Sequence, residues 1–281
     1  MTKSNKKQYM LAVLVAALGY FVDIYDLLLF SIVRVQSLKD LGFTTELELL
    51  EKGVFLINCQ MAGLLIGGVL WGVLGDKKGR LSVLFGSIIM YSLANIANGF
   101  VNSIEAYAIL RIIAGIGLAG ELGAGITLVC ELMPQKIRGY GTTIVAGIGL
   151  FGAVAASTIA GLVEWKTAYI IGGVMGLSLL LLRIGVSESG LFESVKITEV
   201  KRGSFFALFK KKESLKKYIS VILAGVPIWF TIGILITFSP ELGAAMGMTE
   251  LPQAGKAVLF SYVGLAIGDL ASGVLSQVLS S

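Results

Sequence analysis

Eight long apolar runs dominate this chain of 281 residues, and each is long enough to cross a lipid bilayer. A hydrocarbon core of roughly 30 Å takes about 20 helical residues, because an α-helix rises about 1.5 Å per residue. A helix satisfies its own backbone hydrogen bonds in lipid, so the runs predict an all-α, multi-pass membrane protein. We expect membrane spans at residues 9–34, 53–74, 81–101, 104–130, 140–163, 167–186, 218–239 and 256–279.

The composition agrees with a membrane protein and argues against several other classes. Hydrophobic residues make up 56% of the chain and charged residues only 15%, against roughly 25% charged residues in soluble domains. Histidine is absent, and Cys59 and Cys130 do not form a CxxC pair, so neither a metal site nor a disulfide framework is indicated. No phosphate-binding loop of the form GxxxxGKS or GxxxxGKT is present. We therefore expect no cofactor, no metal and no enzyme activity.

Basic residues predict the orientation of the spans, because lysine and arginine accumulate in cytoplasmic loops. With the N-terminus inside the cell, 17 of the 23 lysines and arginines fall in cytoplasmic segments. We therefore place both termini in the cytoplasm and expect the chain to reside in a bacterial cytoplasmic (inner) membrane. The same bias accounts for the net charge of +5, so no nucleic-acid partner is implied.

The spacing of the spans divides the chain into three parts. Residues 1–187 contain six closely spaced spans and form one predicted six-helix half. Residues 188–217 are polar, amphipathic and rich in lysine, so we expect a cytoplasmic linker that lies at the lipid surface. Residues 218–281 hold two further spans, helices seven and eight of a partial second half. This layout is typical of transporters built from two six-helix halves.

The segment GVLGDKKGR at residues 72–80 resembles the signature loop between the second and third helices of the major facilitator superfamily, a family of membrane transporters. The matching positions include Gly72, Asp76, Gly79 and Arg80. Glycines allow a tight turn and a close helix approach, and Asp76 is placed to accept hydrogen bonds at a helix N-terminus. The resemblance implies a gating loop that latches the two halves in the outward-facing state. The alternative is that its basic residues only set the orientation.

Other stretches extend this resemblance. Residues 110–120 resemble the family's pattern in helix four, and residues 134–139 resemble its pattern in the loop after that helix. Residues 186–192 resemble the family's pattern at the end of helix six. The last of these is similar to a segment of sugar and metabolite symporters. Residues 19–30 together with 119–125 resemble metabolite and phosphate proton symporters, and the Gly-Pro pair of antiporters is missing from residues 147–157. The resemblance implies a secondary active transporter that couples protons to a small polar or anionic metabolite by alternating access.

Five ionisable residues lie within the predicted spans, where a charge is costly and usually faces a partner or a cavity. They are Asp23, Asp26, Arg111, Glu121 and Asp269. Asp23 and Asp26 share one helix face because they are three residues apart. Asp26 and Arg111 lie at similar depth, roughly 10–12 Å from the outer ends of their helices, so they could meet.

A meeting of Asp26 and Arg111 would give a mechanism for carrying a proton. An arginine beside an aspartate favours the charged carboxylate, so separating the two links proton uptake to helix movement. The resemblance implies the same roles for a helix-one acid and the helix-four arginine. We therefore predict that Asp26 carries the proton, with Asp23 and Glu121 as further candidates, and that Arg111 controls its affinity. The alternative is a buried pair that only fixes helix packing.

The remaining polar candidates carry weaker signals. Glu121 lies about 15 Å along the helix from Arg111, so it marks either a separate site or a polar contact between helices. Trp229 follows Pro227, and a break in a membrane helix is tolerated beside protein or water. The candidates for lining a substrate cavity, for which ordinary packing is the alternative, are Tyr20, Tyr25, Gln60, Trp229 and Asp269.

The last residues of the chain, 273–281, begin with GVL like the signature segment at 72–80. An internal repeat accounts for this, since the loop after helix eight corresponds to the loop after helix two. We therefore expect four further spans, helices nine to twelve, supplied by a longer product, by a partner or by self-association. The leading prediction is a transporter, and the alternative is a truncated, non-transporting fragment or a subunit that needs a partner.

Overall fold

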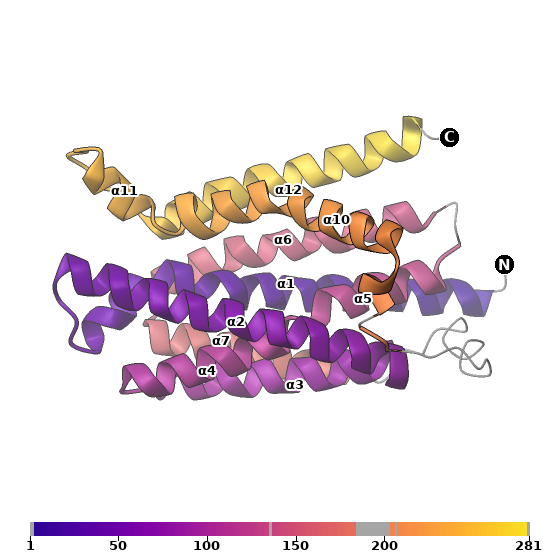
Figure 1. The fold of residues 1–281 in the computed structure, drawn as a ribbon, viewed down its shortest axis with the longest axis horizontal. Coiled ribbons are helices and arrows are strands. Elements are labelled where there is room, and N and C mark those ends of the chain that lie inside the picture. The colour runs from indigo at the N-terminus through magenta and orange to yellow at the C-terminus, as the bar shows by residue number, and fades with distance from the viewer. Residues whose placement is uncertain (1–2, 135–136, 184–202, 206, 280–281) are drawn as a thin grey trace.

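The computed structural model describes residues 3–134, 137–183, 203–205 and 207–279, which form a bundle of helices with short connections (Figure 1). From the N-terminus, the first helices are α1 (Lys3–Asp40), α2 (Glu46–Lys78), α3 (Arg80–Asn98), α4 (Ile104–Leu118), α5 (Glu121–Leu132), α6 (Arg138–Leu162) and α7 (Trp165–Arg183). They are followed by α9 (Ala207–Lys210), α10 (Lys212–Phe230), the π-helical η1 (Thr231–Ile236), α11 (Ser239–Ala245) and α12 (Ala254–Leu279). In these ranges eight segments are long and apolar enough to span a membrane, which confirms the eight predicted spans.

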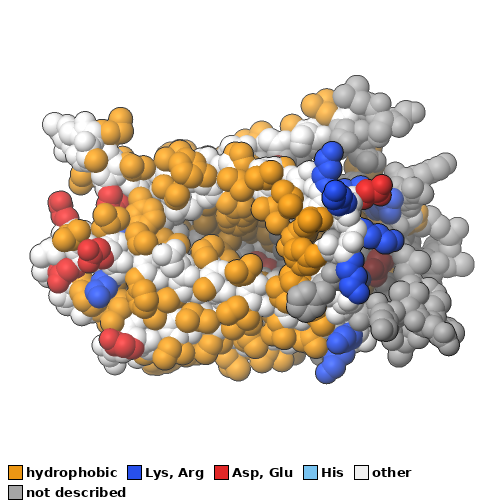
Figure 2. All heavy atoms as spheres, viewed as in Figure 1, with side chains coloured by type: hydrophobic (Ala, Val, Ile, Leu, Met, Phe, Trp, Pro, Cys, Tyr) orange, Lys and Arg blue, Asp and Glu red, His pale blue; other side chains and the backbone are white. Residues whose placement is uncertain are grey.

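Basic and acidic side chains gather at opposite ends of the visible face of the bundle (Figure 2). One end holds the N-terminus and the connection between α2 and α3, and we refer to it as the basic end. The other holds the α1–α2 turn at residues 41–45, and we refer to it as the acidic end. This separation is expected if the basic end faces the cytoplasm, and the orientation itself stays a prediction.

Glycines set how closely the helices approach in the bundle. α1 packs along α6, α2 packs along α4, and α3 packs along both α4 and α7. A methyl group at Gly152 of α6 would meet the Phe21 carbonyl of α1, and one at Gly63 of α2 would meet the Ile112 carbonyl of α4. Small residues at such interfaces let the backbones of two helices touch. In a lipid bilayer the hydrophobic effect does not favour helix association, so this close packing drives it instead.

Helices α1 and α2 run past the predicted ends of their spans, so the connection between them is shorter than expected. Thr45 caps α2: its hydroxyl accepts from the Glu48 amide at 3.3 Å, while Glu48 Oε2 accepts from the Thr45 amide at 3.2 Å. Gly42 turns the chain with a φ of +97°, a conformation that glycine adopts without strain. Arg34, the last residue of the predicted span 9–34, therefore lies inside α1.

The segments after residue 203 pack less completely than the rest. α12 packs along α6, and its Tyr262 is buried in an apolar cluster with residues of α1 and α6. α10 contains Pro227 and has no buried residue. Residues 184–202, which include the predicted pattern at the end of helix six and half of the predicted linker, lie outside the described residues. Lys212, also assigned to the linker, already begins α10, and the three-part division of the chain stays a prediction.

We expect Gly152→Ala to destabilise the bundle, because the added methyl group would overlap the backbone of α1. Overpacking of this kind costs about 1–3 kcal/mol. Gly161→Ala on the same helix is the matched control, since nothing lies within 4 Å of its added methyl group. Thermal unfolding in detergent, followed by circular dichroism, should give a lower Tm for Gly152→Ala and no decrease for Gly161→Ala. Equal Tm values for the two variants would contradict the close contact.

Candidate functional site

A buried polar cluster lies inside the bundle and draws on four helices. It combines Asp26 of α1, Gln60 of α2, Asn95 of α3 and Arg111 of α4, none of which is more than 2% exposed. Arg111 donates a hydrogen bond to Gln60, and Arg111 and Asn95 both lie close enough to Asp26 to influence its charge. The structure thus places Asp26 and Arg111 in one cluster, together with Gln60 and Asn95.

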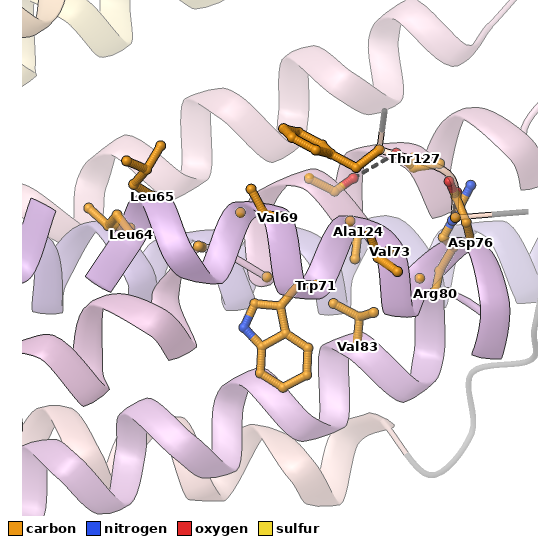
Figure 3. A pocket seen from close by; sticks show the side chains of 18 of the residues that line it. Leu64, Leu65, Val69, Trp71, Val73, Asp76, Arg80, Val83, Ala124 and Thr127 are labelled. Atoms are coloured by element: carbon orange, nitrogen blue, oxygen red, sulfur yellow. Dashed lines mark hydrogen bonds and ion pairs between the residues drawn. The ribbon is translucent and has the colours of Figure 1, made fainter. Parts of the chain in front are cut away.

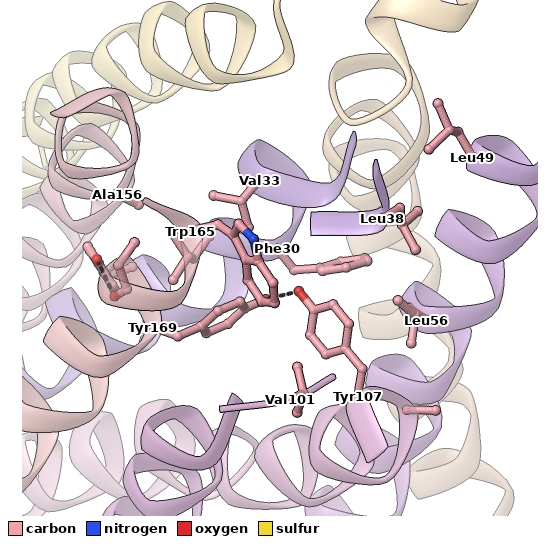
Figure 4. Close-up of a cluster of buried hydrophobic side chains, with 14 residues drawn as sticks. Phe30, Val33, Leu38, Leu49, Leu56, Val101, Tyr107, Ala156, Trp165 and Tyr169 are labelled. Carbon is pink, nitrogen blue, oxygen red and sulfur yellow. Dashed lines mark hydrogen bonds between the residues drawn. The ribbon is translucent and has the colours of Figure 1, made fainter. Parts of the chain in front are cut away.

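Neutral side chains hold Arg111 in place. Its Nη1 donates to the Tyr169 hydroxyl at 3.3 Å, and its Nη2 donates to Gln60 Oε1. The guanidinium carbon lies 5.0 Å from the centre of the Phe30 ring, a distance at which a cation–π attraction operates. The Tyr169 hydroxyl is in turn 2.9 Å from the Tyr107 hydroxyl (Figure 4). The guanidinium is therefore fixed without an ion pair to any described carboxylate.

Asp26 faces Arg111 but does not form an ion pair with it. The described part of the chain contains no ion pair of Asp26 within 4.0 Å, and neither carboxylate oxygen has a hydrogen bond within 3.5 Å. The predicted direct contact is therefore absent in this conformation. α7 makes room for the carboxylate, since a methyl group at Gly172 would meet Asp26 Oδ1. Arg111 thus acts on Asp26 through space, while other residues determine where Arg111 lies.

The remaining predicted acids are placed elsewhere. Asp23 is buried one turn before Asp26, and Tyr20 lies within electrostatic reach of both Asp23 and Asp269. Glu121 is buried as the first residue of α5. Tyr20, Asp23 and Asp269 therefore lie near one another, where α1 contacts α12.

Two of the predicted cavity residues have other positions. Tyr25 is fully buried, and its hydroxyl donates to the Ala168 carbonyl at 2.8 Å, which ties α1 to α7. Trp229 is 53% exposed on α10, a helix without buried residues. Tyr25 is thus engaged in packing, and Trp229 has little contact with the described protein.

A cavity of about 610 Å³ opens beside α2 (Figure 3). Its lining comes from α2, from the start of α3, from residues 119–127, from residues 203–205 and from Tyr218 of α10. Trp71, Asp76 and Arg80 all contribute to this lining, so the cavity reaches the basic end of the bundle. A volume of this size falls within the range of roughly 300–1,000 Å³ for small-molecule pockets.

The fourth span is interrupted for two residues, Ala119 and Gly120, where it borders this cavity. α4 ends at Leu118 and α5 begins at Glu121, although one continuous helix was predicted. Trp71 Nε1 donates to the Ile116 carbonyl at 2.6 Å, just before the break. A methyl group at Gly120 would lie 2.9 Å from the Trp71 ring, so the break and the indole fit together closely.

The predicted gating loop lies at the basic end and is mostly helical. Only Gly79 separates α2 from α3, and its φ of +99° makes the tight turn expected of it. Asp76 accepts from Arg80 at 2.9 Å, and Arg80 also pairs with Glu131 of α5 at 3.5 Å. A methyl group at Gly72 would meet nothing within 4 Å in the described structure, so the close helix approach expected there is absent.

The acidic end contains an ion pair that the sequence analysis missed. Arg34 of α1 is fully buried and pairs with Glu241 of α11. Its Nη1 donates to the Leu49 carbonyl at 3.3 Å, and its guanidinium carbon lies 4.6 Å from the centre of the Phe238 ring. Gly53 of α2 makes room, because a methyl group there would lie 2.7 Å from the arginine side chain. Arg34 thus connects α1, α2 and α11.

The sequence carried only a partial signal for this ion pair. Arg34 directly follows an apolar run, so the sequence predicts that a span ends there. A residue at the end of a span is expected to be exposed, so its burial was not predicted. Glu241 is 207 residues away, so no local pattern links the two. A second contact lies nearby, where the Thr237 and Ser31 hydroxyls are 3.2 Å apart.

Comparison with known proteins identifies relatives of this chain. A family model described as the Major Facilitator Superfamily matches residues 9–281. A putative metabolite transport protein of Haemophilus influenzae is 28% identical, over 95% of this chain and 67% of its own length. In Acinetobacter baylyi, the niacin transporter is 28% identical over 62% of this chain and 40% of its own length. The chain thus spans about two thirds or less of these relatives, which are transport proteins and not enzymes.

Solved structures with this fold include the proton:xylose symporter XylE. Its complex with 6-bromo-6-deoxy-D-glucose has a TM-score of 0.70 at 17% identity, over 98% of this chain and 69% of that one. A partially occluded, inward-open form of XylE from E. coli has a TM-score of 0.66 at 21% identity, over 95% of this chain and 72% of that one. At these identities the likeness shows the fold, and it agrees with the predicted fold class. From the eight membrane helices, the shared fold and the family match, we conclude that this chain belongs to the Major Facilitator Superfamily.

Proposed function

We propose that this chain carries out proton-coupled symport of a small organic acid by alternating access. The fold resembles that of XylE, which is described as a proton:xylose symporter. Relatives are named as transporters of niacin, cis,cis-muconate and benzoate, which are carboxylic acids or their anions. A monovalent organic anion that enters together with one proton moves no net charge, so the membrane potential does not oppose its uptake.

The observation that carries this proposal is a buried carboxylate facing a buried, uncompensated arginine. Asp26 and Arg111 are both 0% exposed, and in the described structure Asp26 has no hydrogen bond within 3.5 Å and no ion pair within 4.0 Å, while Arg111 and Asn95 both lie close enough to influence its charge. A charge at membrane depth costs several kcal/mol and is typical of proton relays and ion pathways. If the pair served only to fix helix packing, we would expect direct contact between the two side chains. The separation favours a carboxylate that gains and loses a proton.

The contacts of Arg111 support a control function. Gln60 and Tyr169 hold the guanidinium, so its position does not depend on whether Asp26 is charged. The energy of the charged form of Asp26 then depends on how far α1 and α4 lie from each other, because a Coulomb interaction falls with distance. A movement between α1 and α4 during transport would therefore change the proton affinity of Asp26.

Alternating access requires one end of the protein to be closed while the other is open. At the acidic end, Arg34 and Glu241 join α1 to α11, and Ser31 and Thr237 add a second contact. At the basic end, the cavity beside α2 is open. With the predicted orientation, this arrangement corresponds to an inward-facing state whose outer side is closed by the Arg34–Glu241 pair.

One observation favours a second candidate function. α10 is apolar along most of its length and yet has no buried residue, so the described structure leaves its surface uncovered. A membrane subunit that transports only after further helices cover this surface would have such a helix. The two candidates differ in one measurable property, which is substrate-dependent proton movement by the chain alone.

We expect Asp26→Asn to abolish proton coupling. In proteoliposomes containing the chain and an external pH dye, addition of niacin, benzoate or cis,cis-muconate should make the external medium more alkaline. Asp26→Asn should reduce this response by at least about tenfold while substrate exchange between the two sides continues, since asparagine cannot carry the proton.

The matched control for this experiment is Glu105→Gln, which removes an exposed carboxylate from the start of α4 and should leave the response unchanged. Proton-coupled uptake that persists in Asp26→Asn would contradict the role of Asp26. No response from the unaltered chain with any of the acids would favour the second candidate function.

We expect Glu241→Gln to open the acidic end. Leaving a buried arginine without its ionic partner costs about 3–5 kcal/mol, which favours the conformation in which Arg34 is hydrated. A reporter cysteine at Ser31, in a chain with Cys59→Ser and Cys130→Ser, should then react with a membrane-impermeant maleimide at least about tenfold faster. Glu250→Gln, which removes an exposed acid near the same end, is the control. An unchanged labelling rate in Glu241→Gln would exclude a closing function for the ion pair.

A further inference from the structure

A chain of hydroxyl groups leads from the polar cluster toward the acidic end. Arg111 Nη1 donates to the Tyr169 hydroxyl at 3.3 Å, and that hydroxyl lies 2.9 Å from the Tyr107 hydroxyl (Figure 4). Ser37 of α1 lies within hydrogen-bonding reach of the Tyr107 hydroxyl, and its own hydroxyl donates to the Arg34 carbonyl at 3.0 Å. All three hydroxyl residues are 0% exposed. The chain therefore connects Arg111 to the residue whose side chain closes the acidic end.

The number of hydroxyl protons gives this chain a direction. Each hydroxyl has one proton to donate, and its oxygen can also accept. Ser37 gives its proton to the Arg34 carbonyl, so its oxygen is left to accept from Tyr107. Tyr107 then accepts from Tyr169, which in turn accepts from Arg111. All the bonds thus run from the guanidinium toward the acidic end, and bonds aligned in this way strengthen one another.

Aromatic packing fixes Tyr107 and ties it a second time to the same part of α1. Its ring stacks on Trp165 with the ring centres 5.8 Å apart, and it meets Phe30 edge-on at 5.6 Å (Figure 4). Trp165 Nε1 donates to Asp40 Oδ2 at 2.6 Å. Asp40 ends α1, six residues after Arg34. Residues 34–40 thus carry the closing ion pair and also hold Tyr107 in place.

Arg111 has an alternative partner if the Tyr169 hydroxyl is lost. Gln60 holds only Nη2, and Nε is buried without a hydrogen bond within the described residues. Removal of the hydroxyl would leave Nη1 unpaired as well. A buried donor without a partner is costly, and Asp26 is a carboxylate within electrostatic reach of the guanidinium. The bond to Tyr169 therefore keeps Arg111 from turning toward Asp26.

We propose that Tyr107 is a positioning residue which, through Tyr169, holds Arg111 apart from Asp26 while the acidic end is closed. Opening of that end displaces residues 34–40, so the hydroxyl chain breaks and Arg111 turns toward Asp26. The direct pair then stabilises the charged carboxylate. By thermodynamic linkage, a proton that binds Asp26 favours closure of the acidic end, and its loss favours reopening. The inference rests on the proposed proton-carrying function of Asp26.

Several other groups also face Asp26. Asn95 approaches it from α3, Tyr25 belongs to its own helix, and Asp23 lies one turn earlier. The Tyr25 hydroxyl is engaged with the Ala168 carbonyl. The variants used below leave these groups unchanged. A difference in the protonation of Asp26 therefore reports the position of Arg111.

The test titrates Asp26 in the full chain, reconstituted in lipid bilayers without substrate. Infrared spectroscopy follows the C=O stretch of the protonated carboxyl group as a function of pH, and loss of the band in Asp26→Asn assigns it. Tyr107→Phe and Tyr169→Phe keep both rings and remove one hydroxyl each. Each should lower the pH at which the band is half-maximal by at least about one pH unit, because the released arginine favours the carboxylate.

The matched control is Tyr140→Phe, which removes an exposed hydroxyl from the start of α6 and should leave the titration unchanged. An unchanged titration in folded Tyr107→Phe or Tyr169→Phe would overturn the positioning function. An equal shift in Tyr140→Phe would overturn it too. Because the measurement needs no substrate, its outcome is independent of whether the chain carries out symport.

A double variant tests the link to the acidic end. Glu241→Gln, which opens that end, should also lower the pH at which the band is half-maximal. Tyr107→Phe in the same chain should then add little, because the hydroxyl chain is already broken. Effects of residues that act through one network are not additive, whereas those of independent residues are. Two shifts that add fully would therefore overturn the link.

Discussion

The charge of Arg111 at membrane depth is the constraint on which the arrangement of the site depends. A guanidinium stays charged in proteins, and burying it costs several kcal/mol unless polar groups surround it. Gln60, Tyr169 and Phe30 supply such groups from α2, α7 and α1, so four helices must meet in one register around the arginine. All three partners are neutral, and the charge is not cancelled. It therefore remains available to act on Asp26.

Two buried arginines in this bundle are accommodated in opposite ways. Arg111 has neutral partners and faces Asp26 across a gap, whereas Arg34 pairs directly with Glu241. A direct pair neutralises both charges and fixes two segments together, which suits a closed end. A separated pair keeps an electrostatic energy that changes with distance, which suits proton coupling. In both places a glycine of a neighbouring helix supplies the room that the charged group occupies, Gly53 for Arg34 and Gly172 for Asp26.

The candidate site could be predicted in part, because burial of an ionisable residue within an apolar run is visible in the sequence. Asp26 and Arg111 were singled out in this way, and the structure places both residues in one buried polar cluster. The expected ion pair between them does not form, because Gln60 and Tyr169 take the hydrogen bonds of the guanidinium. Gln60 was expected to line a cavity and instead holds the arginine. Glu241 carried no signal, since its partner Arg34 lies 207 residues away in the sequence.

The number of membrane helices and the presence of charges inside them were determined by the sequence alone, because each depends only on local composition and on the thickness of a bilayer. The family resemblance also followed from local motifs. Only the tertiary structure decided which side chains those charges meet, where the fourth span breaks beside Trp71, and that Arg34 closes against Glu241. These features depend on how glycine-lined helices dock against one another, and docking joins residues that are distant along the chain.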